Sequence, residues 1–491
     1  MSKYIISIDG GSQSCKVVIY DLLGNVICEG RENLAPMYLA EPRVVEHPDD
    51  DLWRALCEAA KKAMAAFPGK TDEILGIGVG YIRCCRVLQK KNGELAAPVI
   101  SWQDARTATP YEQDVEETGY VTSTSGYITH RLTGQAKDCI GNYFGQWPVD
   151  YNTWNWSTDK NVIEKFNIPE DMLFEAKLPG DVVGHITEDA AKKTGFPPKL
   201  PVICTTADKA VEALGAGLIH ESSAVVSLGT YIALMTPGDK MPKSPNSFWG
   251  IMSSVPHQFI FEGYGIRRGM WTISWFKELL GSGLVVQAEN AGKTPEEFLS
   301  KEAERVPPGS DGLMTVLDWL ANPWEPFKRG VMIGFDAHMD YAYLYRSILE
   351  GIAFTMKNNC DNMSSELGRE FKEVIISGGG SNSDLFMQIF ADVFNLPAKR
   401  NVVNGSASIG AAINTAVGLG VYTDYNEAVS KMIQVRDVFT PIEKNVQLYA
   451  KINQEVYKGL TVHTDEVLKK SHAILRAEED NKKVTVGYSQ A

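Results

Sequence analysis

Several features that define common function classes are missing from this sequence. It has no run of about 18 consecutive apolar residues, which a membrane-spanning helix needs, and no apolar N-terminal stretch typical of a signal peptide. We therefore expect a cytoplasmic protein without a membrane partner. The formal net charge is -13 and no block of Lys or Arg occurs. A nucleic-acid partner is not expected either, because phosphate backbones bind to basic surfaces.

The usual cysteine and glycine motifs are absent as well. The eight cysteines form no CxxC pair and no Cys/His spacing suited to zinc, so we expect reduced thiols. Two segments resemble the end of a P-loop, Gly69-Lys70-Thr71 and Gly292-Lys293-Thr294, but Met64 and Gln287 stand where that motif requires glycine. No run satisfies G-x-G-x-x-G. A nucleotide, if one binds, must be held in another way.

The length points to two domains, because a single hydrophobic core rarely grows beyond about 250–300 residues and this chain has 491. Hydrophobic residues make up 44% and charged residues 22%, which is typical of a globular protein. Stretches with strand character alternate with stretches of helical character, so the sequence predicts an α/β fold.

Two distant segments share one layout of apolar strand, small-residue turn and apolar strand. The first spans residues 4–20 around Asp9-Gly10-Gly11-Ser12-Gln13-Ser14-Cys15-Lys16, and the second spans 224–234 around Ser227-Leu228-Gly229-Thr230. Small side chains let backbone N–H groups face an anion, so each turn suits a phosphate, and Asp9 is placed to hold the accompanying Mg²⁺. An ordinary hairpin turn is the alternative for the first segment. The repeat favours phosphate-binding hairpins on two facing domains.

The first half contains a strand that leads directly into a helix at Asp208. Four other elements are expected before it, a helix at 49–67 and strands at 74–80, 86–89 and 99–102. The strand 201–206 runs into Asp208 and a helix that ends near Gly217. This carboxylate is therefore expected at the carboxyl end of a sheet, where ligands of α/β proteins bind. Its alternative role is a helix N-cap.

The second half contains a glycine-rich loop between a strand and a helix. The loop Gly378-Gly379-Gly380-Ser381-Asn382-Ser383 follows the strand 373–377 and precedes the helix 384–394. Bare backbone there lets a flat ligand lie close, although a simple connecting loop is the alternative. Further helices are expected at 269–280, 341–363, 405–418 and 446–475, with a frayed tail at 476–491.

In this order the motifs resemble the FGGY family of carbohydrate kinases, which belong to the actin-like ATPase superfamily. The resemblance includes Trp102-Gln103-Asp104-Ala105-Arg106 and the pairs Glu262-Gly263, Arg329-Gly330 and Glu350-Gly351. It implies an α/β fold of two actin-like ATPase (ribonuclease H-like) domains that face each other across a cleft. The N-terminal domain is expected at 1–238, with the sugar site, and the C-terminal domain at 239–475, with the adenosine site.

The resemblance also implies roles for individual residues. ATP would be the phosphate donor with Mg²⁺ held by Asp9, and Asp208 would accept the proton of the attacking hydroxyl. The β- and γ-phosphates would contact Gly11, Ser12, Gln13, Lys16, Gly229 and Thr230. The adenosine loop would consist of Gly378, Gly379, Gly380, Ser381 and Asn382.

The sugar side departs from the family pattern. Members of the glycerol type show Asn-Gln-Arg-Glu where this chain has Tyr81-Ile82-Arg83-Cys84, so only Arg83 matches. Lys209 stands where Asn or Gln usually follows the catalytic aspartate, and the segment 107–126 is short. We expect Arg83 and Lys209 to contact the substrate. Their alternatives are a solvated strand end and a surface helix residue.

Two further residues, Trp102 and Asp104, are expected at the sugar. For Trp102 the alternative is a core aromatic, since tryptophan is usually buried. Asp104 suits polyol hydroxyls, but a local ion pair with Arg106 is equally compatible with the sequence.

The function expected from the sequence is phosphorylation of a small sugar or polyol, with a ketopentose such as xylulose as the leading substrate. Ribulose, glycerol and an autoinducer-type linear pentanedione stay open, the last because Arg305-Val306-Pro307-Pro308-Gly309-Ser310 resembles a run in such kinases. The rival class is a non-catalytic nucleotide-dependent binding protein of the same superfamily. A homodimer is also compatible with the sequence.

Overall fold

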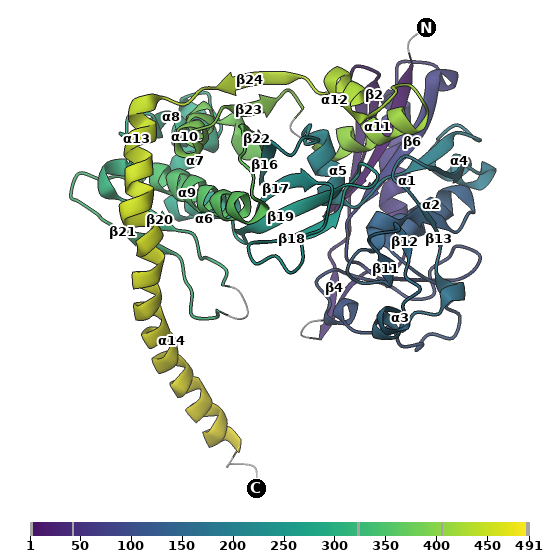
Figure 1. Cartoon of the computed structure of the whole chain (residues 1–491), viewed down its shortest axis with the longest axis horizontal. Coiled ribbons are helices and arrows are strands. Elements are labelled where there is room, and N and C mark those ends of the chain that lie inside the picture. The colour runs from purple at the N-terminus through teal and green to yellow at the C-terminus, as the bar shows by residue number, and fades with distance from the viewer. Residues whose placement is uncertain (1–2, 42–43, 322–324, 404–405, 488–491) are drawn as a thin grey trace.

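Two large mixed sheets dominate the computed structural model of the chain, which describes residues 3–41, 44–321, 325–403 and 406–487 (Figure 1). The first sheet has the order β14-β15-β6-β1-β2-β3 and the second the order β18-β19-β17-β16-β22-β23-β24. The strands of the first are β1 (Tyr4–Gly10), β2 (Ser14–Asp21), β3 (Val26–Asn33), β6 (Ile74–Tyr81), β14 (Val182–His185) and β15 (Pro201–Cys204). Those of the second are β16 (Ser223–Leu228), β17 (Ile232–Gly238), β18 (Phe248–Met252), β19 (Phe259–Ile266), β22 (Glu373–Ser377), β23 (Ala398–Asn401) and β24 (Val435–Phe439).

The two sheets repeat one core topology. In the first, the antiparallel hairpin β1–β2 continues into antiparallel β3, while β6 and β15 lie parallel on the other side of β1. In the second, β16–β17 continues into antiparallel β19, while β22 and β23 lie parallel on the other side of β16. The α/β fold expected from the sequence is therefore confirmed, and both predicted hairpins form the centres of their sheets.

The helices cover these sheets and connect them. Those of the first half are α1 (Asp51–Ala66), α2 (Thr124–Thr133), α3 (Lys160–Phe166), α4 (Glu188–Thr194) and α5 (Asp208–Gly215). Those of the second half are α6 (Trp271–Leu280), α7 (Ser282–Asn290), α8 (Pro295–Ala303), α9 (Tyr341–Leu367), α10 (Asp384–Phe394), α11 (Ser406–Gly418), α12 (Tyr425–Met432), α13 (Glu443–Ile452) and α14 (Lys458–Gly487).

Short strands form the remaining small sheets. These strands are β4 (Tyr38–Glu41), β5 (Val44–His47), β7 (Val87–Gln89), β8 (Val99–Ile100), β9 (Tyr120–Thr122), β10 (Lys137–Cys139), β11 (Val149–Asp150), β12 (Asn155–Trp156), β13 (Glu175–Lys177), β20 (Met314–Val316) and β21 (Val331–Ile333). The sheet β4-β5-β8 and the pair β7-β9 belong to the first half and support the loops beside β6.

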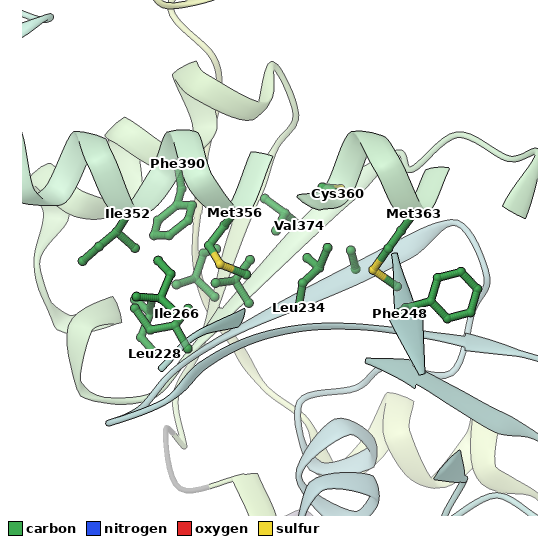
Figure 2. Packing of buried hydrophobic residues seen from close by; sticks show 14 of the residues in the cluster. Leu228, Leu234, Phe248, Ile266, Ile352, Met356, Cys360, Met363, Val374 and Phe390 are labelled. Carbon is green, nitrogen blue, oxygen red and sulfur yellow. The ribbon is translucent and has the colours of Figure 1, made fainter. Parts of the chain in front are cut away.

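The core of the second half lies between the second sheet and α9. Figure 2 shows Ile352, Met356 and Met363 on α9 above Leu234 of β17 and Phe248 of β18. All five side chains are at most 1% exposed. Burying one hydrophobic side chain of this size stabilises a fold by about 1.5–3 kcal/mol. Helix α9 thereby covers one face of the sheet, while Val225 and Met235 share a separate cluster with Ala210 and Ala213 of α5.

Helix α11 comes from the second half of the chain but packs on the first sheet. Its Ile413 shares a cluster with Ile5 of β1 and Val18 of β2, and Gly410 lies against the backbone of Val211 in α5. The Ser7 hydroxyl of β1 donates to the backbone carbonyl of α11 residue 408 at 2.5 Å. The pair α5–α11 therefore joins the two sheets.

The strands place the domain boundary earlier than the sequence analysis did. Because β16 and β17 pair within the second sheet, a boundary after residue 238 would cut that sheet. We propose a boundary in the segment 217–222, between α5 and β16. The sequence interval 107–126 holds only a short 3-10 turn, β9 and the start of α2.

The C-terminal helix is longer than expected. The predicted helix 446–475 is divided into α13, a π-helical turn at Asn453–Tyr457 and α14, which continues to Gly487 where a frayed tail was expected. Figure 1 shows α14 projecting beyond the body. Within the described ranges, no helix combines the length and the apolar character needed to cross a bilayer. The predicted helix start at Gly405 lies outside the described residues.

Substituting Gly410 with Ala tests the contact between α5 and α11. A Cβ at this position would lie 2.0 Å from the Val211 carbonyl oxygen, so the helices must separate. We expect the free energy of unfolding to fall by about 1–3 kcal/mol, measured by chemical denaturation. The matched control is Gly459→Ala in α14, where an added Cβ meets no atom within 4 Å among the described residues. It should raise stability by about 0.5–1 kcal/mol. Equal stability of both variants would contradict this packing.

Candidate active site

Asp9 lies at the end of β1, between the two neighbouring strands. It pairs with Lys16 of β2 and Gly80 of β6. Burial raises the pKa of Asp9 to about 6, and the negative charges of Asp208 and Glu212 add to the shift. The three carboxylates are therefore close enough to repel one another.

The turn after β1 offers two amides to an anion. The Gly11 amide donates to the Ser14 carbonyl oxygen at 3.0 Å, so this amide closes the turn and is not available as predicted. The amides of Ser12 and Gln13 make no hydrogen bond within the described part of the chain. Lys16 forms an ion pair with Glu29 at 2.7 Å, so its charge is already balanced.

The turn after β16 is held through its carbonyl oxygens, while its amides stay free for a ligand. The carbonyl oxygen of Gly229 accepts from the Met270 amide at 3.1 Å, and that of Thr230 accepts from the Gly269 amide at 2.8 Å. No hydrogen bond from the amides of Gly229 and Thr230 is found among the described residues. Both predicted turns therefore present free backbone donors.

Asp208 is the first residue of α5, and it is not the helix cap. The N-cap position is Ala207, without a side-chain capping bond, and among the described residues the Asp208 carboxylate accepts one hydrogen bond, from the amide of Lys209 at 2.9 Å. Its side chain is 33% exposed. Burial raises the pKa of Asp208, while the positive charges of Arg83 and Lys209 lower it. The net effect is a raised pKa, which makes this carboxylate a better proton acceptor than an exposed aspartate.

Arg83 lies between two carboxylates that come from different domains. Its Nη2 donates to Glu262 Oε2 of β19 at 2.9 Å, and its Nε is 4.0 Å from Asp208 Oδ1. Burial disfavours the charge of Arg83, yet Glu262 and Asp208 raise its pKa above the usual value. The alternative of a solvated strand end is therefore excluded.

Lys209 is tied to a neighbour on its own helix. Its Nζ donates to Glu212 Oε2 at 2.7 Å, and the other oxygen of Glu212 accepts from the Ser227 hydroxyl of β16. Burial alone would raise the pKa of Glu212, but Lys209 and Ser227 hold it below the usual value. Lys209 is thus a partner of Glu212, and its charge acts on Asp208 at the same time.

Two of these residues, Glu212 and Glu262, were not predicted as site residues. Glu212 stands four residues after Asp208, so both lie on one face of α5. Glu262 is a lone carboxylate in the otherwise apolar strand β19, and its side chain is 0% exposed. A charged residue that interrupts a buried strand is a signal that sequence reasoning can use.

Trp102 is not a core aromatic, because its side chain is 48% exposed. It follows β8 in a turn. Two backbone hydrogen bonds, from the Arg86 amide to the Ile100 carbonyl oxygen and from the Ile100 amide to the Arg86 carbonyl oxygen, each 3.0 Å long, hold this turn beside the segment after β6. Trp102 and Arg83 thus lie on neighbouring segments. An exposed indole face there suits the C–H face of a sugar.

Asp104 has the structural role that the sequence left open as the alternative. Its side chain is buried and accepts from the Val45 amide at 2.6 Å. It also accepts three hydrogen bonds from Arg106, at 2.7–3.0 Å. Each carboxylate oxygen accepts two of these hydrogen bonds, so we propose a structural role for Asp104 in place of the predicted contact with the sugar.

Cys84 has a backbone conformation that is rare for a residue with a side chain. Its φ is +64°, in the left-handed region that costs about 1–2 kcal/mol for residues other than glycine. The chain turns sharply here, directly after Arg83. Burial raises the pKa of Cys84, which stays a thiol beside the charged groups.

The glycine-rich loop after β22 is divided into a packed and an open half. Gly378 has φ +87°, and a Cβ there would lie 2.5 Å from the Leu228 carbonyl oxygen. Gly380 is buried against Leu228, and the buried hydroxyl of the next residue, at position 381, donates to the Gly378 carbonyl oxygen at 2.8 Å. Only Gly379 and Asn382 are exposed, so these two positions are open to a base while Gly380 and Ser381 hold the loop.

The donors around Asp9 fit a nucleotide-bound magnesium ion. Hard carboxylate oxygens are the protein ligands that Mg²⁺ prefers, together with water and phosphate. In the described ranges no three Asp, Glu, His or Cys side chains form a complete metal cage. A cation that brings its own water and phosphate ligands would need only Asp9, whose pKa is raised first by burial and then by the negative charges of Asp208 and Glu212.

Comparisons with family models match both halves of the chain. Residues 4–123 match the N-terminal domain, and residues 224–419 the C-terminal domain, of the FGGY family of carbohydrate kinases. The second match starts at β16, in agreement with the boundary that we propose.

Similar proteins span nearly the whole chain. An uncharacterized sugar kinase of Escherichia coli, YgcE, is 60% identical over 98% of this chain and 97% of its own length. The xylulose kinase of Lactococcus lactis is 25% identical over 97% and 99%. Among solved structures, gluconate kinase from Lactobacillus acidophilus has a TM-score of 0.82 at 20% identity, covering 96% and 100%. Xylulose kinase from the same organism has a TM-score of 0.81 at 20% identity, covering 95% and 99%.

Substitutions of Asp104 and Trp102 test whether Asp104 has a structural role and Trp102 faces the ligand. Asp104→Asn removes the charge that Arg106 faces in a buried pair, so the free energy of unfolding should fall by about 2–3 kcal/mol. Trp102→Ala removes a half-exposed side chain and should change stability by less than about 1 kcal/mol, but weaken sugar binding. Denaturation curves and sugar titrations measure both. Sugar affinity lost in Asp104→Asn at unchanged stability would reverse the assignment.

Proposed function

Because the chain belongs to the FGGY family of carbohydrate kinases and is an ATP-dependent phosphotransferase acting on a sugar, we propose that it phosphorylates a ketopentose such as xylulose, with Asp208 as the general base. The observation that carries the proposal is the position of Asp208. It lies at the first residue of α5, 33% exposed, between Arg83 and the Lys209–Glu212 pair.

The first step assigned to the chain is proton removal. The Asp208 carboxylate would accept the proton of the attacking sugar hydroxyl as the oxygen approaches the γ-phosphorus. Burial strengthens the affinity of this carboxylate for the proton, and the positive charges of Arg83 and Lys209 offset part of that effect. Burial is the larger influence, so the pKa of Asp208 lies above its usual value and the carboxylate is a better proton acceptor than an exposed aspartate.

The phosphates would lie between the two hairpin turns. The amides of Ser12 and Gln13 on the first sheet, and of Gly229 and Thr230 on the second, are the free donors of these turns. Amides that are fixed before the reaction stabilise the charge of the transferring group without reorganisation. Since the donors come from both domains, the attacking and leaving oxygens are aligned by the approach of the two sheets.

Asp9 is the residue that would hold Mg²⁺, through water or directly. When bound, the ion neutralises charge on the β- and γ-phosphates. Asp9 itself is oriented by its strand pairs with Lys16 and Gly80. The adenine would lie over the open half of the glycine-rich loop, at Gly379 and Asn382.

The charge of the site favours a neutral sugar. Four carboxylates, those of Asp9, Asp208, Glu212 and Glu262, surround two cations, those of Arg83 and Lys209, and each cation already faces a carboxylate. A substrate with its own carboxylate would add repulsion, whereas hydroxyl groups of a ketose can donate to Asp208 and accept from Arg83.

Names of similar proteins support a ketose or polyol but leave more than one substrate open. Relatives 24–25% identical include a xylulose kinase, glycerol kinases and autoinducer-2 kinases. Ribulose, glycerol and the autoinducer are therefore the alternatives to xylulose. The non-catalytic binding protein considered as a rival has no support, because the matched family consists of kinases.

An ADP-release screen with Mg-ATP tests the function. We expect turnover with D-xylulose above that with D-ribulose, glycerol, gluconate and the autoinducer. Asp208→Asn keeps the size and polarity of the side chain, so turnover should fall by about 10²-fold or more, while calorimetry should find ATP binding retained. Activity with gluconate alone would reject the ketopentose, and near-normal turnover of the variant would reject Asp208 as the base.

Gly379→Val tests the adenosine loop. An added Cβ meets no described atom within 4 Å, so the variant should fold normally and block only a ligand that lies over the loop. We expect ATP affinity to fall about tenfold or more, as for a lost set of close contacts, at unchanged sugar affinity. The contrast is Gly380→Val, whose Cβ would lie 2.7 Å from Leu228 Cδ1, and which should lose stability instead. Normal ATP binding by Gly379→Val would place the base elsewhere.

A further inference from the structure

The ion pair between Arg83 and Glu262 joins the sugar side of the first domain to the second domain. Arg83 follows β6 in the first sheet, and Glu262 lies in β19 of the second, 179 positions later in the sequence. The contact is a charged hydrogen bond of 2.9 Å between Nη2 and Oε2. A residue of the second domain thus fixes the group that faces Asp208.

Glu262 occupies a place where a carboxylate is costly. Its side chain is 0% exposed, and its Oε1 has no hydrogen-bond partner within the described part of the chain. A buried charge with one of two oxygens unpaired destabilises a fold unless it is needed there. The neighbours of Glu262 across β17 and β18 are Met235 and Trp249, so a neutral residue would suit the sheet better.

The bond to Glu262 determines where the other donors of Arg83 point. A guanidinium is planar, with its five N–H donors in a rigid fork. Once Nη2 is fixed on Glu262, Nε faces Asp208 Oδ1 at 4.0 Å. Nη1 makes no hydrogen bond to any described residue, so a substrate oxygen can take this donor.

We propose that Glu262 is a positioning residue for sugar recognition, which holds Arg83 in the orientation that presents its free donor beside Asp208. The proposal rests on the function proposed above, because it takes Arg83 as a sugar contact. It assigns to the second domain a part in sugar binding that acts only through Arg83. Nucleotide binding, which uses other segments, is independent of it.

Glu262→Gln tests the proposal, because it removes the charge and keeps the size. The substrate is D-xylulose, or the screened sugar with the fastest turnover. We expect the KM for the sugar to rise by about tenfold or more, the scale of a charged hydrogen bond, with the KM for ATP changed less than about twofold. A structural role alone would lower the stability of the protein and the fraction of active enzyme, but it would not change the KM for the sugar more than the KM for ATP.

A double-mutant cycle shows whether Glu262 acts through Arg83. If it does, Arg83→Gln and Arg83→Gln/Glu262→Gln should have the same kcat/KM for the sugar within about twofold. The matched control is Glu373→Gln in β22 of the same sheet, which pairs with Lys399 at 2.5 Å away from the site, and which should leave both KM values unchanged.

Two results would overturn the proposal. One is a double variant whose loss of kcat/KM for the sugar equals the product of the losses in the two single variants. The other is an unchanged KM for the sugar in Glu262→Gln. Failure of the proposed function gives a different result, since it appears as normal turnover in Asp208→Asn, whatever the outcome of the cycle.

Discussion

Mutual repulsion of carboxylates is the constraint on which the arrangement of this site depends. Asp9, Asp208, Glu212 and Glu262 converge where the two sheets meet, and burial makes their charges costly. Arg83 and Lys209 are each placed between two of them. Negative and positive groups therefore alternate across the site, from Glu262 of the second domain to Glu212 in the middle of α5. Removing any one charge leaves a neighbour unbalanced.

The repeated sheet topology explains why these groups can meet. In each sheet the central hairpin turns back at the edge where its parallel neighbour also ends, so β1 and β6 deliver Asp9 and Arg83 to one place. Helix α5 starts at that edge and leads to β16, whose Ser227 bonds to Glu212. Helix α11 returns from the second half and packs on α5. The connection between the domains is thus part of the site.

Local features of the sequence were sufficient to predict the parts of the site that depend on local structure. The two hairpin turns, the strand-to-helix junction at Asp208 and the glycine-rich loop follow from small residues at strand ends. Part of what was missed depended on partners far away in the sequence, although Glu212 was missed beside its near neighbour Lys209. The role of Glu262 depends on Arg83, 179 positions before it, and no local pattern records this pairing. Asp104 was ambiguous for the same reason, since the Val45 amide that occupies it lies 59 positions away.

Charge balance also explains the departure from the family pattern at Lys209. A cation beside the base would compete with the substrate for the carboxylate, but Glu212 takes the ammonium at 2.7 Å, and Ser227 holds Glu212 in turn. Lys209 and Glu212 are about one helical turn apart, so the charge of this lysine is balanced on its own helix. Near the sugar side this leaves the Nη1 donors of Arg83, which bond to no described residue, and the half-exposed indole of Trp102. We therefore propose that selection of the sugar rests on contacts with Arg83 and Trp102, which would suit a small neutral molecule with a C–H face and adjacent hydroxyl groups.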